Sequence, residues 1–137
     1  MKVIPLGPTV ATEVSAALRR NEVVCLLCDR DIQRTGTEVT LFGETTKLPS
    51  GPALMSLRTG AALLPVGVYF TDSVDGHRAV VRPHLSIETT GKLRTDVAAL
   101  TQSLAKELEH LISLAPEQWH LLQPNWPSDP GYELPST

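Results

Sequence analysis

The run Val23-Val24-Cys25-Leu26-Leu27 constrains the fold of this chain more than any other segment. An unbroken apolar run of this length is typical of a central strand in a parallel sheet, where helices cover both faces. The charged residues Asp29-Arg30-Asp31 follow almost at once. The sequence therefore predicts a buried strand at residues 23–27 with a polar loop at its carboxyl end, where open α/β sheets bind their ligands.

Composition limits the classes of protein to which the chain can belong. A hydrophobic fraction of 42% over 137 residues is enough for one domain with one core. The 15 acidic and 12 basic residues are nearly balanced, so no basic patch favours nucleic acid and no polybasic block favours electrostatic membrane attachment. Residues 1–7 are too short and too broken by Pro5 and Gly7 for a signal peptide. We interpret them as the end of a buried strand, so that the chain begins inside the fold.

Hydrophobic spacing and turn residues predict the other elements. In chain order these are a helix after Thr9, a strand at 38–42, a helix capped by Ser50 or Gly51, a strand at 62–70 weakened by Pro65, a turn at Asp75-Gly76, a strand at 77–87 and a long helix at 93–111. The order indicates an α/β sandwich in which helices cover a mixed, mostly parallel sheet. Residues 1–123 are expected to form the domain, and the proline-rich tail at 124–137 to be an extended wrap or disordered.

Glu44 is the first candidate for chemistry. It comes where the strand at 38–42 is expected to end and a polar loop to begin, a position that suits a catalytic or orienting carboxylate. We expect its side chain to face a groove at the edge of the sheet. An ordinary exposed loop glutamate is the alternative.

Two further places are candidates for binding an anionic substrate. Arg30 lies between Asp29 and Asp31, where it can contact a phosphate or form a structural ion pair with either neighbour. Ser50 and Gly51 stand at a predicted helix start, whose free backbone N–H groups are able to hold an anion. Most helices begin without a ligand, so the second signal is weak on its own.

Cys25 and Cys28 have the C-x-x-C spacing of redox pairs and of half a zinc site. In a strand the positions i and i+3 point to opposite faces, and no second Cys/His pair completes a zinc site. We therefore predict two buried structural cysteines in a reducing compartment, and no metal. Trp119 and Trp126 are interpreted as core residues rather than membrane-facing aromatics.

Several segments, taken in this order, resemble the bacterial lipid A lauroyl/myristoyl acyltransferase family, part of the wider glycerolipid acyltransferase superfamily. The matching stretches lie at 23–31, 39–44, 48–53, 59–66 and 116–119, and they include Phe42-Gly43-Glu44, Leu48-Pro49-Ser50-Gly51 and Pro116-Glu117-Gln118-Trp119. Within this family the chain is similar to the C-terminal half of the actinobacterial phosphatidylinositol mannoside acyltransferases.

The resemblance implies transfer of a fatty acyl group from acyl-CoA, a substrate and not a cofactor, to a mannose hydroxyl of a phosphatidylinositol mannoside. It implies peripheral attachment at the cytoplasmic face of the plasma membrane. The family uses an H-x-x-x-x-D/E motif whose histidine deprotonates the acceptor. Glu44 matches the acidic partner of that histidine, and Arg30 matches an arginine that binds phosphate. Gly43 and Thr45 depart from the F-P-E-G segment of the superfamily.

The motif itself does not occur in this sequence, since none of its four histidines is followed five positions later by Asp or Glu. We therefore expect the N-terminal half of the same enzyme to be the partner that supplies the base, and the chain alone to be inactive. Two other interpretations stay open. One is a non-catalytic remnant or binding module with the same fold, and the other is an unrelated small α/β domain.

Overall fold

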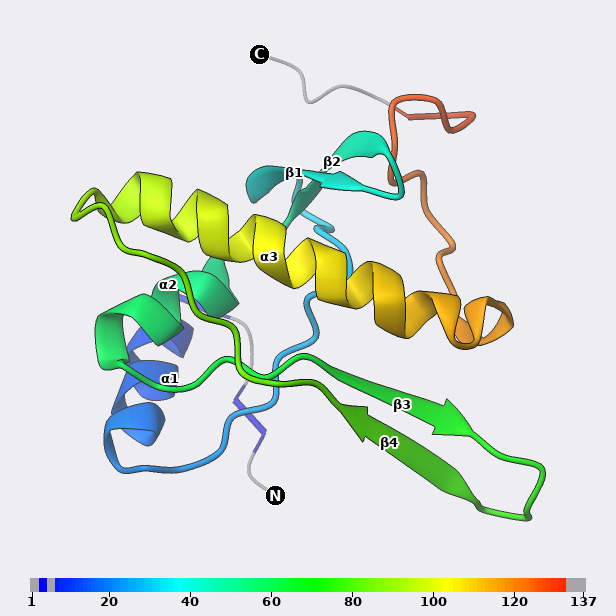
Figure 1. Ribbon diagram of the computed structural model, residues 1–137, viewed down its shortest axis with the longest axis horizontal. Helices are drawn as coiled ribbons and strands as arrows, with labels where there is room; N and C mark the ends of the chain where they lie inside the picture. The colour runs from blue at the N-terminus through cyan, green and yellow to red at the C-terminus, as the bar shows by residue number, and fades with distance from the viewer. Residues whose placement is uncertain (1–2, 5–6, 133–137) are drawn as a thin grey trace.

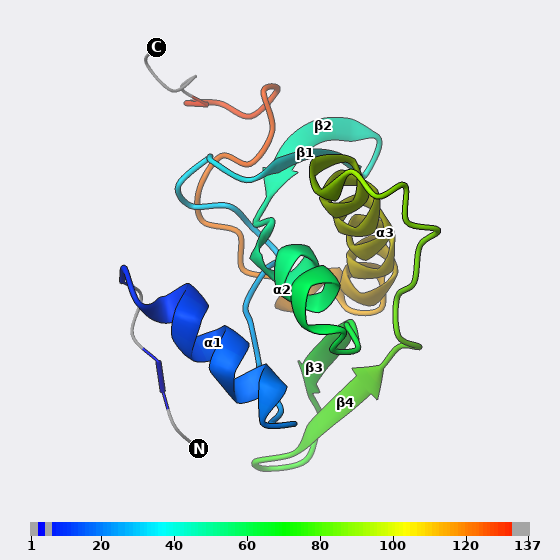
Figure 2. The same ribbon diagram turned by 90° about the vertical axis from the view of Figure 1, so that its left-hand side faces the viewer.

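The computed structural model describes residues 3–4 and 7–132, and its fold is organised around one long helix. This helix, α3 (Leu93–Ser113), crosses the middle of the molecule in Figure 1 and is seen nearly end-on in Figure 2. The other elements are α1 (Val10–Arg19), β1 (Thr37–Leu41), β2 (Glu44–Leu48), α2 (Gly51–Thr59), β3 (Val66–Phe70), β4 (His77–Val81) and the 3-10 helix η1 (Pro116–Gln118).

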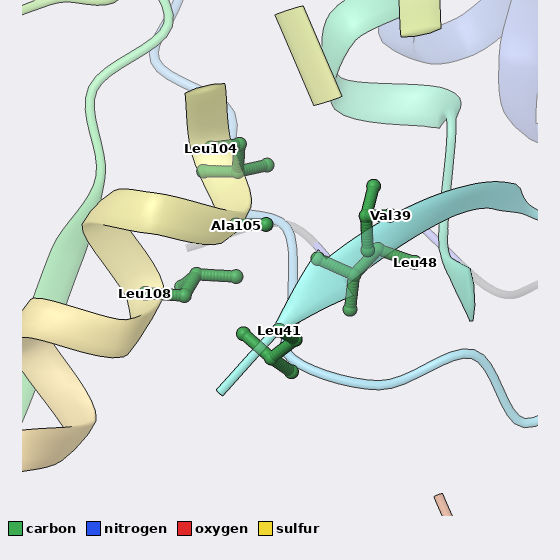
Figure 3. Close-up of a cluster of buried hydrophobic side chains, with 6 residues drawn as sticks. All are labelled: Val39, Leu41, Leu48, Leu104, Ala105 and Leu108. Atoms are coloured by element: carbon green, nitrogen blue, oxygen red, sulfur yellow. The ribbon is translucent and has the colours of Figure 1, made fainter. Parts of the chain in front are cut away.

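The hairpin β1–β2 covers one side of α3. Its turn consists of Phe42 and Gly43, both in the left-handed region with φ of 52° and 80°, as the two-residue turns that suit twisted hairpins require. Period-2 alternation then directs the apolar side chains of both strands to the same face. These side chains pack on one stripe of the helix (Figure 3), and the cluster contains Val39, Leu41, Leu48, Leu104, Ala105 and Leu108.

A second cluster lies nearer the N-terminal end of α3. There Ala53 of α2 packs against Val97 and Leu100 of α3. The expected start and stop signals of α2 are both present, with Ser50 as its N-cap and Gly60 ending it at φ 74°. The helix α1 contacts α2, and Asn21 follows its C-terminus at φ 61°.

The second hairpin, β3–β4, is attached to α3 by one face only. The Tyr69 hydroxyl donates a hydrogen bond to the Leu111 carbonyl oxygen of α3 at 2.7 Å. In Figure 1 the hairpin projects away from the other elements. Its outward face presents Val66, Val68 and Phe70, which are 47%, 64% and 67% exposed. An apolar strand face left this open is unusual for a sheet in a closed domain.

The prediction of a mixed, mostly parallel sheet is wrong for the described part of the chain, which forms two separate two-stranded antiparallel sheets. Sequence reasoning placed a loop after Phe42. The chain instead reverses at Phe42-Gly43 and adds β2, whose alternation of Thr46 and Leu48 with polar neighbours was overlooked. Pro65 does end the regular pairing of β3, and only the isolated bridge between Leu63 and Leu85 lies beyond it.

The predicted central strand at 23–27 is also wrong. These residues belong to neither a helix nor a strand, and the side chains of Val23 and Leu27 are 93% and 98% exposed. The predicted opening strand lies partly outside the described residues, and Val3, which is described, is 76% exposed and not in a strand. No strand lies beside these apolar residues to bury them in the described part of the chain.

The described part of the tail packs against β1–β2. The Trp126 indole N–H donates to the Leu41 carbonyl oxygen at 3.1 Å, and the Thr46 hydroxyl donates to the Asn125 carbonyl oxygen. The Asp129 carboxylate accepts the backbone N–H groups of Asn125 and Trp126, which lowers its pKa. Residues 124–132 are thus a wrap, while 133–137 lie outside the described residues.

The position of α3 at the centre of the fold predicts how two leucine substitutions differ. Leu104→Ala should lower the free energy of unfolding by about 2–5 kcal/mol, because Leu104 is 2% exposed and its removal leaves a cavity between α3 and β1. Leu27→Ala, at a 98% exposed site, should change it by less than about 0.5 kcal/mol. Urea unfolding of both variants measures the difference, and equal losses would contradict this description of the core.

Candidate functional site

One cavity in the described part of the structure lies between the connector at 26–29 and β3, with α3 as its floor. It has a volume of about 320 Å³, within the range of small-molecule pockets. Its floor is apolar and comes from Leu108, Leu111 and Ile112. One end is closed by Gln118 and Trp119 of the segment that follows α3. We call this feature the connector–β3 groove.

An aromatic cluster adjoins the groove at the turn of the β1–β2 hairpin. The rings of Phe42, Trp119 and Trp126 lie 6.1–6.4 Å apart, in tilted and edge-on arrangements that suit aromatic pairs. The Trp119 indole N–H donates to the Asp29 carboxylate at 2.9 Å. Both tryptophans are half-buried and pack against the β1–β2 core cluster.

Glu44 stands at the start of β2, directly after the hairpin turn, and not at the carboxyl end of a strand. Its carboxylate accepts two hydrogen bonds from Ser128, one from the backbone N–H at 3.0 Å and one from the hydroxyl at 2.6 Å. Glu44 is half-buried and is not among the residues that line the connector–β3 groove. A catalytic role for this carboxylate stays a prediction.

The structure brings only part of the predicted site together. Asp29 lines the groove and, through Trp119 and Phe42, is linked to the hairpin turn that carries Glu44. Arg30 follows Asp29 in the same connector and is half-buried. Ser50 and Gly51, at the start of α2, come after the opposite end of β2 from Glu44, and the strand itself spans roughly 14 Å at a rise of about 3.4 Å per residue. The anion-binding role of the α2 start therefore stays a separate prediction.

The two cysteines differ in their surroundings, and neither forms a disulfide. The prediction that both are buried is wrong for Cys25, which is exposed in the connector. Cys28 lines the groove, and burial together with the nearby Asp29 charge raises its pKa to about 11. No group of three or more His, Cys, Asp or Glu side chains is placed to hold a metal ion among the residues described.

Two glutamines with a structural role at the sheet edges were missed by sequence reasoning. The Gln118 side-chain amide accepts the Phe70 backbone N–H at 2.8 Å and donates to the Phe70 carbonyl oxygen at 3.3 Å. Gln102 of α3 makes the same pair of bonds with Thr40 of β1, at 2.8 and 2.9 Å. Each side-chain amide thus pairs with the backbone N–H and C=O groups of one residue at the edge of a strand. Only the match at 116–119 pointed to Gln118, and no local signal marked Gln102.

Comparison with known proteins identifies the family of this chain. The model of the family described as bacterial lipid A biosynthesis acyltransferase matches residues 3–128, and the chain belongs to this family. It is 46% identical over 131 residues to the phosphatidylinositol mannoside acyltransferase of Mycobacterium tuberculosis strain H37Rv, covering 93% of this chain and 39% of the relative. It is 40% identical over 131 residues to the protein of the same name from Mycolicibacterium smegmatis, covering 93% and 41%.

The chain therefore spans about two fifths of the length of these curated relatives, and the match falls on their C-terminal part. Family membership excludes the interpretation of an unrelated α/β domain. None of the helices in the described ranges has the length and apolarity that a membrane crossing needs.

The contrast between the cysteines gives a test of the groove. At pH 8 iodoacetamide should modify Cys25 readily and Cys28 slowly, because a thiol with a pKa of about 11 is almost entirely protonated and only the thiolate reacts. In a Cys25→Ser variant, the rate at Cys28 should rise about tenfold per pH unit until the pH approaches that pKa. Mass spectrometry of the peptides reports both rates. Rapid modification of Cys28 at pH 8 would show that the groove is open to solvent.

Proposed function

We propose that this chain supplies the C-terminal part of an enzyme that transfers a fatty acyl group from acyl-CoA to a mannose hydroxyl of a phosphatidylinositol mannoside. One observation carries the proposal, the 46% identity over 93% of the chain to a relative of that name. Lipid acyl transfer follows from the family, and the acceptor comes from the relatives.

In the proposed reaction the acceptor hydroxyl oxygen attacks the thioester carbonyl carbon, an ester bond forms, and the C–S bond breaks. The hydroxyl proton passes to a base and then to the departing CoA sulfur. The sequence contains no H-x-x-x-x-D/E motif to provide that base. We therefore assign the base to the N-terminal half of the same enzyme.

For this chain's own residues we propose an orienting role for Glu44 and phosphate contacts for Arg30. Glu44 is supported by its position beside the hairpin turn, where two hydrogen bonds from Ser128 hold its carboxylate in one orientation. Asp29 would position its neighbour Arg30, since Trp119 fixes the Asp29 carboxylate. Ser50 and Gly51 are proposed to bind an anionic group of one substrate through the start of α2.

Work at the cytoplasmic face of the plasma membrane is part of the proposal, because the acceptor is a membrane lipid and acyl-CoA is water-soluble. Peripheral attachment of the assembled enzyme would give both substrates access to the same site. No cofactor is required for the transfer, since the thioester provides the activated acyl group.

The first prediction concerns the chain by itself. Purified alone, it should transfer no acyl group from palmitoyl-CoA to a phosphatidylinositol mannoside in mixed micelles, because it lacks the base. Co-expression with the part of the Mycobacterium tuberculosis relative that precedes the matched region should restore transfer. Acyl-lipid formation by mass spectrometry is the measurement. Turnover by the chain alone would disprove the assignment of the base to the N-terminal half. An assembled but inactive pair would favour the alternative of a non-catalytic remnant or binding module.

The second prediction concerns Glu44. In the assembled pair, Glu44→Gln should lower kcat at least about tenfold while binding is kept, because an amide cannot polarise a histidine as a carboxylate does. Glu38→Gln is a matched control, since Glu38 is an exposed glutamate on the same hairpin, at the solvent side of β1. Because glutamine keeps only one acceptor oxygen for the two Ser128 donors, urea unfolding of both variants is measured beside kcat. Equal activity would remove Glu44 from the site.

A further inference from the structure

We propose that Ser128, in the C-terminal wrap, is a positioning residue that fixes the orientation of the Glu44 carboxylate for the acyl-transfer reaction. The inference rests on the proposed function in taking Glu44 as the carboxylate that orients the histidine of the N-terminal half. It extends the site to residues 124–132, which lie beside the β1–β2 hairpin in Figures 1 and 2.

Ser128 contacts both oxygens of the Glu44 carboxylate. Its backbone N–H donates to Oε1 at 3.0 Å, and its hydroxyl donates to Oε2 at 2.6 Å. Two donors on two oxygens oppose rotation of the carboxylate, which a single donor would permit. Glutamate is among the side chains that lose most rotamer freedom when they are held. A carboxylate that is already held does not incur this entropic cost during the reaction.

The contact with Ser128 leaves the Glu44 carboxylate able to accept a further donor. An ionised carboxylate can accept about four hydrogen bonds, two on each oxygen, and Ser128 uses one on each. Glu44 is half-buried rather than enclosed. An imidazole N–H can therefore reach a free lone pair of this carboxylate while Ser128 stays bound.

A tight turn gives Ser128 its place beside Glu44. The Asp129 backbone N–H donates to the Trp126 carbonyl oxygen at 3.0 Å, which closes a four-residue turn with Pro127 second and Ser128 third. Proline is favoured at the second position of such turns because its ring fixes φ near the required value. The Asp129 carboxylate also accepts the backbone N–H of Trp126 at 3.0 Å, which stabilises the turn from within.

The turn is attached to both strands of the β1–β2 hairpin. The Trp126 indole N–H donates to the Leu41 carbonyl oxygen of β1 at 3.1 Å, and the Thr46 hydroxyl of β2 donates to the Asn125 carbonyl oxygen. Thr46 and Asn125 are both buried. These two contacts hold the wrap on the hairpin without any help from the Ser128 side chain.

The two attachments favour a positioning role for Ser128 over a role in fastening the tail. A contact that only fastened the tail would be redundant, since Trp126 and Thr46 already fasten it. Loss of the Ser128 hydroxyl would keep the backbone donor on Oε1 of Glu44 and free Oε2. The change should therefore alter the orientation of Glu44 and leave the fold intact.

Kinetics of the pair assembled with the preceding part of the Mycobacterium tuberculosis relative test the proposal. Ser128→Ala should lower kcat about three- to tenfold with KM for palmitoyl-CoA unchanged, the loss expected for one hydrogen bond that acts in the transition state. Ser128→Thr keeps a hydroxyl and should restore most of the parent activity. Ser73→Ala is the matched control, since Ser73 is an exposed serine in the turn of the other hairpin. Full activity of Ser128→Ala would overturn the proposal.

A double-mutant cycle shows whether Ser128 acts through Glu44. In a Glu44→Gln background, Ser128→Ala should cause no further loss of kcat, because a residue that acts only through the carboxylate has nothing left to position. A further loss as large as that in the parent would overturn the proposal. The urea midpoint of Ser128→Ala should equal that of the parent, and a lower midpoint that accounts for the lost activity would show a purely structural role.

A measurement on the chain alone does not depend on activity. Three-bond NMR couplings along the Glu44 side chain should report one rotamer in the parent chain and averaging among several in Ser128→Ala. Averaged couplings in the parent chain would overturn the proposal.

The outcomes separate this inference from the proposed function. A loss of kcat in Glu44→Gln but not in Ser128→Ala would overturn the positioning role and leave the function standing. Fixed couplings in the parent chain without acyl transfer by the assembled pair would support the contact and count against the function.

Discussion

The packing of several elements on one apolar stripe of α3 is the interaction on which the rest of the structure depends. The β1–β2 hairpin and α2 bury their leucines and alanines against successive turns of the helix. The β3–β4 hairpin is held to the same helix through Tyr69. A two-stranded hairpin is marginally stable by itself, so neither sheet would persist without this shared support. The helix also positions the connector–β3 groove, since Leu108, Leu111 and Ile112 of α3 form its floor.

The helices were predictable because their signals are local. Apolar side chains at three- and four-residue steps, Pro52 near a start and Gly60 at an end each act within one element, and the structure has α1, α2 and α3 where these signals place them. The sheet was less predictable because strand pairing joins residues across the fold. A short run such as 38–42 does not say whether its partner is the next segment or one far along the chain. The positive φ at Phe42, a residue with no preference for it, was the deciding feature.

The candidate site was predictable only in part, for a related reason. The resemblance located Glu44, Asp29 and Arg30 on segments that the family model covers, and the chain belongs to that family. It did not reveal that Ser128 from the tail holds Glu44, or that Trp119 holds Asp29, because these contacts join residues more than 80 positions apart. Ser50 and Glu44 were both predicted as site residues, and the intervening β2 places them beyond opposite ends of that strand.

The amide of Gln118 has a consequence for how far any edge pairing can extend. The amide binds the backbone of Phe70 as one residue of a neighbouring strand would. Only the backbone groups of Val66 and Val68 are then left for pairing at this edge. So short a template favours a segment that is already tethered nearby and penalises chance encounters between identical molecules. The Gln118 side chain thereby limits both the length of any strand added at this edge and fibre-like growth through edge pairing.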